Sequence, residues 1–319
     1  MSAPATTRTR PTWPELPAAV RAAIERRIGA VTGWTSHDGG YSPGMASTLR
    51  APGGAVFVKA VSAVHEFSAH LYREEARRAA LLPPGVPAPR FLWSAEIEAP
   101  DARDREWVTI AFETTPSRSP RIPWHDDELG AVLDLAVAVG EHTVSGDVFP
   151  SFSRELPTGA ALLAAERPSG LATYDPWLPD HLDRIAELEL EAPAAVEGAH
   201  LVHADMRGDN ALLVGHGAEV RALAVDWPYA ARGAAFCDLV GMLPATHVEG
   251  GPPPEEALRR RPLPPGTDED AVTAFLASMT GYFVHSSLLA PPPAIPHLRA
   301  FQRAQGEVCI AWLRRRLGG

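Results

Sequence analysis

The chain has 319 residues, of which 45% are hydrophobic and 21% are charged, and its net charge at neutral pH is −10. This composition is typical of a globular protein with a buried core, and the length favours two lobes over one large domain. No apolar run approaches the ~18 residues that a membrane span needs. A nucleic-acid-binding protein normally has a basic face, so the net negative charge disfavours that class.

The N-terminal residues and the two cysteines indicate where in the cell the protein is expected. Residues 1–14 combine Arg and hydroxyl side chains without an apolar segment, so we expect a loose tail and not a secretory signal. Cys237 and Cys309 lie far apart, and neither has a second Cys or His at metal-ligand spacing. The sequence therefore predicts a cytoplasmic protein with two buried thiols.

The first third of the chain alternates short apolar segments with turns, in the order helix, three strands, helix, two strands. Pro at the start and Gly at the end delimit the first helix, and Pro83 with Pro84 ends the second. The expected helices cover residues 17–29 and 65–82, and the expected strands cover 33–37, 45–50, 55–61, 89–97 and 106–113.

A glycine-rich turn, GGYSPG, stands between the first two of these strands. Its Gly40-Tyr41-Ser42-Pro43-Gly44 matches the nucleophile elbow of hydrolases, but that motif needs an N–H after the Ser, and Pro43 has none. Glycines in such a turn also let backbone amides approach a phosphate closely. We interpret Gly40, Ser42 and Gly44 as part of a phosphate-binding loop.

Lys59 lies in the next strand and is the only lysine in a chain with 28 arginines. It could be a remnant of compositional bias, or a point charge that must reach a phosphate where a planar guanidinium would not fit. The helix that follows contains Glu74 and Glu75. Glycine turn, strand lysine and helix glutamate is the order found in kinase folds, which favours the phosphate interpretation.

The stretch AHLVHADMRGDNALLV at 199–214 places His203, Asp205 and Asn210 between two apolar runs, and a third run ends at Asp226. Phosphoryl transfer needs these groups: one carboxylate accepts a hydroxyl proton, while an amide oxygen and a second carboxylate hold Mg²⁺. Arg207 stands where a cation could neutralise the transferring phosphoryl group, or it forms an ordinary salt bridge.

From about Gly33 to the last helix, the sequence resembles the aminoglycoside phosphotransferase and choline-kinase-like enzymes, which share the protein-kinase fold. The resemblance rests on GGYSPG, FVK, REEARRAALLPPGVPAPRFL, LVHADMRGDNALL, VDWPYAARGAAFCDL and FQRAQGEVCIAWLRRRL. Ala204 departs from it, because a glycine is usual between the His and the Asp. The missing D-F-G and A-P-E motifs disfavour protein kinases.

The resemblance implies a role for each candidate residue. Asp205 would be the catalytic base and Arg207 a second catalytic group, while Asn210 and Asp226 would bind magnesium. Lys59 would contact phosphate with Glu74 as its partner, although Glu75 is adjacent and stays an alternative. Gly40, Ser42, Gly44 and Glu113 would contribute to nucleotide binding, and His203 and Asp238 would support the catalytic loop.

We therefore expect an α+β, bilobal, protein-kinase-like fold. Residues 1–113 would form a lobe with a five-stranded antiparallel sheet, 114–118 a hinge, and 119–319 a mainly helical lobe. The expected activity is Mg²⁺-dependent transfer of the γ-phosphoryl of ATP or GTP to a small-molecule hydroxyl in a monomer or homodimer. Residues 1–113 include 13 basic and 12 acidic residues, whereas the rest of the chain includes 16 basic and 27 acidic residues. The negative charge therefore lies after Glu113. This favours a cationic acceptor such as an aminoglycoside. A sugar, amino alcohol or nucleoside, or a non-catalytic nucleotide-binding role, stays an alternative.

Overall fold

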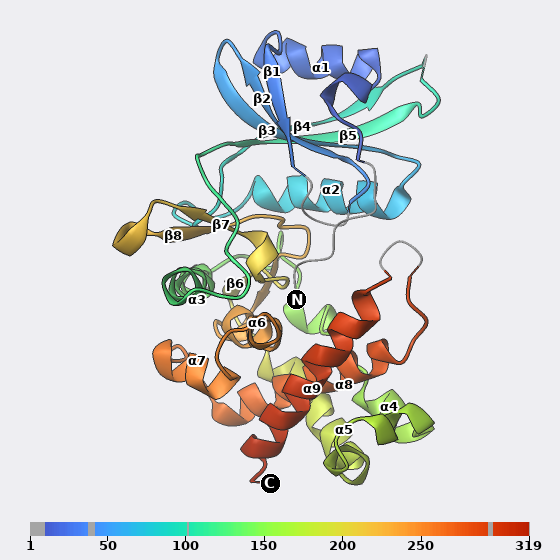
Figure 1. Ribbon diagram of the computed structural model, residues 1–319, viewed down its shortest axis with the longest axis vertical. Helices are drawn as coiled ribbons and strands as arrows, with labels where there is room; N and C mark the ends of the chain where they lie inside the picture. Colours follow the sequence, from blue (N-terminus) through green and yellow to red (C-terminus); the bar gives the residue numbers. More distant parts are fainter. Residues whose placement is uncertain (1–9, 38–41, 101, 293–295, 319) are drawn as a thin grey trace. The chain divides into compact units, whose positions relative to one another are not determined.

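The computed structural model describes residues 10–37, 42–100, 102–292 and 296–318. Its residues group into two compact units (Figure 1). The N-terminal unit contains the described residues up to Arg118 together with Leu223–Tyr229, and the C-terminal unit contains Ser119–Ala222 and the chain from Ala230 onward.

An antiparallel sheet with the strand order β1-β2-β3-β5-β4 forms the N-terminal unit. The interior strand β5, between β3 and β4, is buried from Trp107 to Phe112. This explains its continuous apolar run, because both faces of the strand are covered. The strands are β1 (Gly33–Ser36), β2 (Met45–Ala51), β3 (Gly54–Ser62), β4 (Phe91–Glu98) and β5 (Glu106–Glu113). The five-stranded antiparallel sheet predicted from the sequence is confirmed.

Two helices cover opposite faces of this sheet, α1 (Ala18–Ile28) and α2 (Glu66–Ala79) (Figure 1). Side chains alternate between faces along a strand. In β3, Val58 and Ala60 pack in the cluster that includes α1, whereas Val61 packs with α2. By this alternation Lys59 projects from the face that α2 covers.

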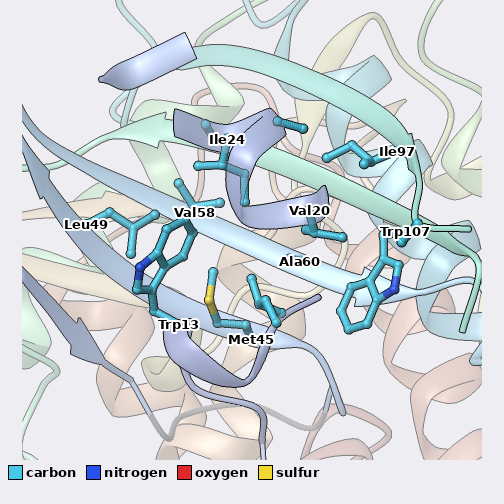
Figure 2. Close-up of a cluster of buried hydrophobic side chains, with 13 residues drawn as sticks. Trp13, Val20, Ile24, Met45, Leu49, Val58, Ala60, Ile97 and Trp107 are labelled. Atoms are coloured by element: carbon cyan, nitrogen blue, oxygen red, sulfur yellow. The ribbon is translucent and has the colours of Figure 1, made fainter. Parts of the chain in front are cut away.

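The α1 side of the sheet corrects one expectation about the N-terminus. Residues up to 14 were expected to be a loose tail, but the short 3₁₀ helix η1 (Trp13–Glu15) begins within them. Trp13 is 5% exposed and packs with Met45, Leu49 and Val58 (Figure 2). Replacing a buried Trp by Ala typically costs about 3–5 kcal/mol of stability. That burial fixes this stretch. Residues 1–9 lie outside the described residues.

The C-terminal unit is mainly helical, as predicted. Short strand pairs accompany the helices: β6 (His200–Val202) pairs with β9 (Ala231–Gly233), and β7 (Ala211–Val214) with β8 (Arg221–Ala224). The helices are α3 (Asp126–Gly140), α4 (Ala160–Glu166), α5 (Trp177–Ala195), α6 (Cys237–Val248), α7 (Pro254–Arg260), α8 (Glu269–Ser287) and α9 (Leu298–Arg316). The 3₁₀ turns are η2 (Phe152–Arg154), η3 (Ser169–Thr173), η4 (Gly208–Asn210) and η5 (Gly217–Glu219).

Burial of the two cysteines agrees with the sequence. Cys237 at the start of α6 and Cys309 in α9 are free thiols, 2% and 0% exposed. Burial raises the pKa of both thiols, so they act as small apolar side chains and not as nucleophiles. Within the described parts of the chain, each helix is too short or too polar to cross a membrane.

Candidate active site

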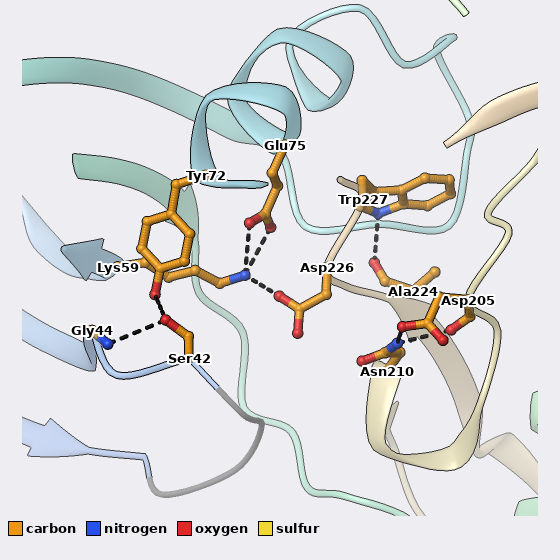
Figure 3. A network of polar contacts seen from close by, with 10 residues as sticks. All are labelled: Ser42, Gly44, Lys59, Tyr72, Glu75, Asp205, Asn210, Ala224, Asp226 and Trp227. Atoms are coloured by element: carbon orange, nitrogen blue, oxygen red, sulfur yellow. Dashed lines mark hydrogen bonds and ion pairs between the residues drawn. The ribbon is translucent and has the colours of Figure 1, made fainter. Parts of the chain in front are cut away.

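Lys59 forms ion pairs with two carboxylates inside the N-terminal unit (Figure 3). Its Nζ lies 2.8 Å from both Oε atoms of Glu75 and also contacts Asp226. The Lys59 and Glu75 side chains are 12% and 4% exposed, whereas Asp226 is 40% exposed. Lys59 is thus held by the buried carboxylate of Glu75, whereas the carboxylate of Asp226 is accessible to solvent.

The charges of this group follow from its burial. Burial alone would lower the pKa of Lys59, but Asp226 and Glu75 outweigh it and raise that pKa above its ordinary value. Burial raises the pKa of the Glu75 carboxyl to about 7, against the opposing effect of Lys59. Lys59 therefore stays a cation at neutral pH.

The choice of Glu74 as the first partner of Lys59 is wrong, and Glu75 takes that place. Glu74 instead accepts hydrogen bonds from Arg77 and Arg78, both at 2.8 Å. The reason is the phase of α2, which turns by about 100° per residue. Its apolar stripe, formed by Ala69, Tyr72, Ala76 and Ala79, lies about 180° from Glu74 but only about 80° from Glu75. These two angles follow from the sequence alone, so the choice of Glu75 could have been made from the sequence.

The glycine-rich turn is described from Ser42 onward, and Gly40 lies outside the described residues. Ser42 Oγ accepts a hydrogen bond from the Gly44 N–H at 3.1 Å and lies 2.9 Å from Tyr72 Oη. A Cβ on Gly44 would lie 2.6 Å from the Ala60 carbonyl oxygen. Only glycine fits here, because β3 approaches the turn so closely.

The loop after β6 is tied to α6 through Asp238, which is 5% exposed. Its two carboxylate oxygens accept hydrogen bonds from the backbone N–H groups of His203 (2.6 Å) and Ala204 (2.9 Å). Asn210 donates through Nδ2 to the Asp205 backbone oxygen at 2.8 Å and to its Oδ2 at 3.0 Å. These contacts fix the conformation of the loop and the direction of the Asp205 side chain.

His203 and Ala204 adopt unusual positions within this loop. His203 is fully buried, and its Nδ1 lies 3.3 Å from the Asp205 backbone N–H, which donates to it. Ala204 has a φ of 65°, in the left-handed region that glycine adopts without strain. The alanine that departs from the resemblance thus stands at a position whose backbone favours glycine.

Arg207 contacts carboxylates on both sides of it in the loop. Its side chain is 24% exposed, 3.0 Å from Asp209 and 3.4 Å from Asp205. Nearby Glu249 is largely buried, which raises its carboxyl pKa to about 7, with Asp209 adding to the rise and Arg207 opposing it. The geometry therefore includes the salt bridge that the sequence left open, and places a cation beside Asp205.

Glu113 ends β5 and is more than half exposed, with its carboxylate 3.4 Å from Arg90. Its backbone N–H donates to the Arg90 carbonyl oxygen at 2.8 Å. The structure thus gives its side chain a surface ion pair, which contributes little to stability.

The sequence profile of the phosphotransferase enzyme family matches residues 45–275 of this chain. The chain belongs to this family. That match covers more than half of the protein and confirms the resemblance inferred from its motifs. A search of curated proteins found no match.

Solved structures share the phosphotransferase fold with this chain at low sequence identity. A thermostable mutant of aminoglycoside phosphotransferase APH(4)-Ia, in a ternary complex with AMP-PNP and hygromycin B, has a TM-score of 0.59 at 14% identity, covering 95% of this chain and 100% of that one. A microcompartment-associated aminopropanol kinase has a TM-score of 0.55 at 14% identity, covering 94% and 97%. Spectinomycin phosphotransferase APH(9)-Ia, with ADP and spectinomycin, reaches 0.54 at 11%, covering 93% and 98%. Identities this low establish the fold alone.

The residues of this phosphotransferase offer oxygen ligands of the kind that Mg²⁺ prefers. Asn210 uses its amide nitrogen for Asp205, which leaves its side-chain oxygen for another group. Asp226 presents an accessible carboxylate. No cluster of three or more His, Cys, Asp or Glu suited to a metal occurs among the described residues.

Sequence reasoning missed one residue of this arrangement, Tyr72. Its hydroxyl contacts Ser42, and its ring lies 5.8 Å from Lys59 Nζ. The available signal was its spacing, three residues before Glu75 and therefore on a neighbouring part of the same helix face.

Proposed function

We propose that this protein transfers the γ-phosphoryl group of ATP or GTP, with Mg²⁺, to a hydroxyl group of a small molecule. The observation that carries the proposal is the braced loop that presents Asp205 next to Asn210. A half-exposed carboxylate fixed in direction by its neighbours is what a hydroxyl proton acceptor requires. The family membership supports phosphoryl transfer as the chemistry.

Each residue has a part in the proposed reaction. Asp205 accepts the proton of the acceptor hydroxyl, and Arg207 balances negative charge next to it. Lys59, held by Glu75, contacts the nucleotide phosphates. Asn210 and Asp226 would each supply an oxygen to Mg²⁺, which neutralises phosphate charge when it is bound.

For the acceptor, we propose a cationic antibiotic such as an aminoglycoside. The acidic composition after Glu113 supports a cation, because a negative surface potential concentrates cationic ligands. Hygromycin B and spectinomycin accompany two of the similar structures. A second candidate is a small amino alcohol, and the similarity to an aminopropanol kinase favours it. Both candidates combine a hydroxyl with an ammonium group.

A mass-spectrometric screen tests the proposal. The protein is incubated with MgATP or MgGTP and panels of aminoglycosides, other antibiotics, amino alcohols, sugars and nucleosides. We expect one class to gain a single phosphate with wild type and not with Asp205→Asn. If no compound gains phosphate and the protein binds neither nucleotide, the proposed function is wrong. Nucleotide binding without transfer would favour the non-catalytic alternative.

A further inference from the structure

The hydroxyl of Tyr72 connects the glycine-rich turn to α2. The Tyr72 side chain belongs to the buried cluster beneath the sheet and is 5% exposed. Its Oη lies 2.9 Å from Ser42 Oγ. Figure 3 shows Tyr72 and Glu75 reaching from α2 toward Ser42 and Lys59, respectively. One helix therefore holds both the turn and the lysine.

Either hydroxyl of this contact can be the donor, and the hydrogen-bonding capacity of Ser42 allows Tyr72 to donate. A serine hydroxyl has one hydrogen to donate and two lone pairs that accept. The Gly44 N–H already occupies one lone pair of Ser42. When Tyr72 donates to the other, the hydrogen of Ser42 is left for a third group. Burial raises the pKa of Tyr72, with Lys59 and Ser42 opposing, so its hydroxyl is neutral and has a hydrogen to donate.

Gly44 provides independent evidence that the contact is built into the fold. A Cβ at Gly44 would lie 2.9 Å from Tyr72 Oη and 2.9 Å from Val61 Cβ. Any other residue would therefore push the turn away from both α2 and β3. The glycine and the tyrosine hydroxyl occupy adjoining space, and each limits what the other position can accept.

We propose that Tyr72 is a positioning residue for nucleotide binding. It orients the Ser42 hydroxyl as a donor to a phosphate oxygen and fixes the turn to the helix that holds Lys59. This inference rests on the proposed function, because the third group is a phosphate of the nucleotide. Tyr72 itself touches no substrate.

The test compares a ligand that has phosphates with one that lacks them. Dissociation constants for MgATP and for adenosine are measured by calorimetry with wild type, Tyr72→Phe, Ser42→Ala and the double variant. We expect Tyr72→Phe to weaken MgATP binding about threefold to tenfold, the scale of one intramolecular hydrogen bond, and to leave adenosine binding unchanged. The double variant should bind MgATP no more weakly than Ser42→Ala, because both changes remove the same contact.

Tyr174→Phe is the matched control. It removes a buried tyrosine hydroxyl that also bonds a serine, Ser287, in the C-terminal unit. This variant should bind MgATP like wild type. Melting temperatures without ligand show that each variant is folded, and the ring retained in Tyr72→Phe keeps the packing of the core.

Three results would overturn the inference: unchanged MgATP binding in Tyr72→Phe, equal weakening of adenosine binding, or additive losses in the double variant. Equal weakening of both ligands would indicate a purely structural tyrosine. A wild-type protein that binds neither MgATP nor MgGTP would overturn the proposed function as well. The two failures are therefore distinguishable.

Discussion

At the scale of single residues, Lys59 has a more buried environment than its place in a strand suggests. It is 12% exposed and bonded to Glu75 and Asp226. Lys59→Arg puts a longer, planar group into this space, so we expect MgATP binding to weaken at least about tenfold. Because the pair is buried, we also expect a loss of about 1–3 kcal/mol in stability without ligand.

Calorimetry with MgATP and urea unfolding measure the two effects of Lys59→Arg separately. Arg77→Lys is the control, since the ion pair of Arg77 with Glu74 lies at the surface. It should change both quantities little. If Lys59→Arg matched wild type in both assays, arginine would serve here as elsewhere in the chain, and the phosphate-contact role would be wrong.

Asp205 tests the proposed base. Asp205→Asn keeps the shape of the side chain and a partner for Asn210 but cannot accept a proton at neutral pH. We expect turnover to fall by about 10²–10⁴, the usual contribution of a positioned base, while the MgATP-induced rise in melting temperature persists. Asp209→Asn, at a 48% exposed neighbour that bonds Arg207, should reduce turnover less than about tenfold. A similarly small fall for Asp205→Asn would contradict the assignment.

Ala204 offers a test of backbone strain. A left-handed φ costs a non-glycine residue about 1–2 kcal/mol, whereas glycine loses about 0.5–1 kcal/mol of unfolded-chain entropy. We therefore expect Ala204→Gly to stabilise the protein by about 0.5–1 kcal/mol in urea unfolding. Ala22→Gly, at an exposed position inside α1, should destabilise it by a similar amount. Destabilisation by Ala204→Gly would show that the alanine methyl has a packing role.

At the scale of elements, α4 depends on a carboxylate from α5. Glu189 is 6% exposed and accepts hydrogen bonds from the first free N–H groups at the start of α4: Gly159 (2.7 Å), Ala160 (2.9 Å) and Ala161 (3.0 Å). Glu189→Ala leaves the buried N–H groups of Gly159 and Ala160 without their acceptor, so we expect a loss of about 2–4 kcal/mol, and a smaller loss for Glu189→Gln.

Urea unfolding and hydrogen exchange of the α4 amides check this prediction. Glu187→Ala is the control, because Glu187 is 64% exposed and its ion pair with Arg184 lies at the surface of the same helix. It should cost less than about 0.5 kcal/mol. If Glu189→Ala were as mild as Glu187→Ala, water would replace the carboxylate at the helix start without cost.

The elements that the sequence predicts are those in which apolar residues recur at a regular spacing. The strands of the N-terminal sheet and α2 have clear apolar spacing and clear turn residues, and their order was predictable. The Glu189 cap was not, because a carboxylate on one helix gives no signal of the helix start that it reaches 28 to 30 residues earlier. The same holds for Tyr72, whose partner Ser42 lies 30 residues earlier. Such contacts depend on tertiary packing, which no local pattern contains.

The site shows the same division. The resemblance implied that His203 and Asp238 would support the catalytic loop, but it did not predict the hydrogen bonds from Asn210 to Asp205. The partner of Lys59 required the phase of α2, and one residue of error selected the opposite helix face. Alanine itself does not indicate the left-handed backbone at position 204, and the glycine that is usual there in the resemblance was the available signal.

At the scale of the whole molecule, the chain leaves the C-terminal unit at Leu223 to supply seven residues to the N-terminal unit, and returns after Tyr229. In this segment the Ala224 N–H donates to the Pro87 carbonyl oxygen at 2.8 Å, and Asp226 contacts Lys59. Trp227 in the same segment is 2% exposed, with Nε1 bonded to the Ala224 carbonyl oxygen. The N-terminal unit is therefore discontinuous in sequence.

This discontinuity predicts that residues 10–118 alone form an incomplete unit. Without the returning segment, Lys59 loses one of its carboxylates, and the connection between α2 and β4 loses its backbone hydrogen bond at Pro87. We expect the fragment 10–118 to be less stable by about 2–4 kcal/mol than the same fragment joined through a flexible linker to residues 222–230. Urea unfolding followed by circular dichroism compares the two. The linked fragment with Asp226→Ala should recover only part of the difference, because it restores the segment but not its charge. Equal stability of the linked and unlinked fragments would show that the segment docks on a unit that is already complete.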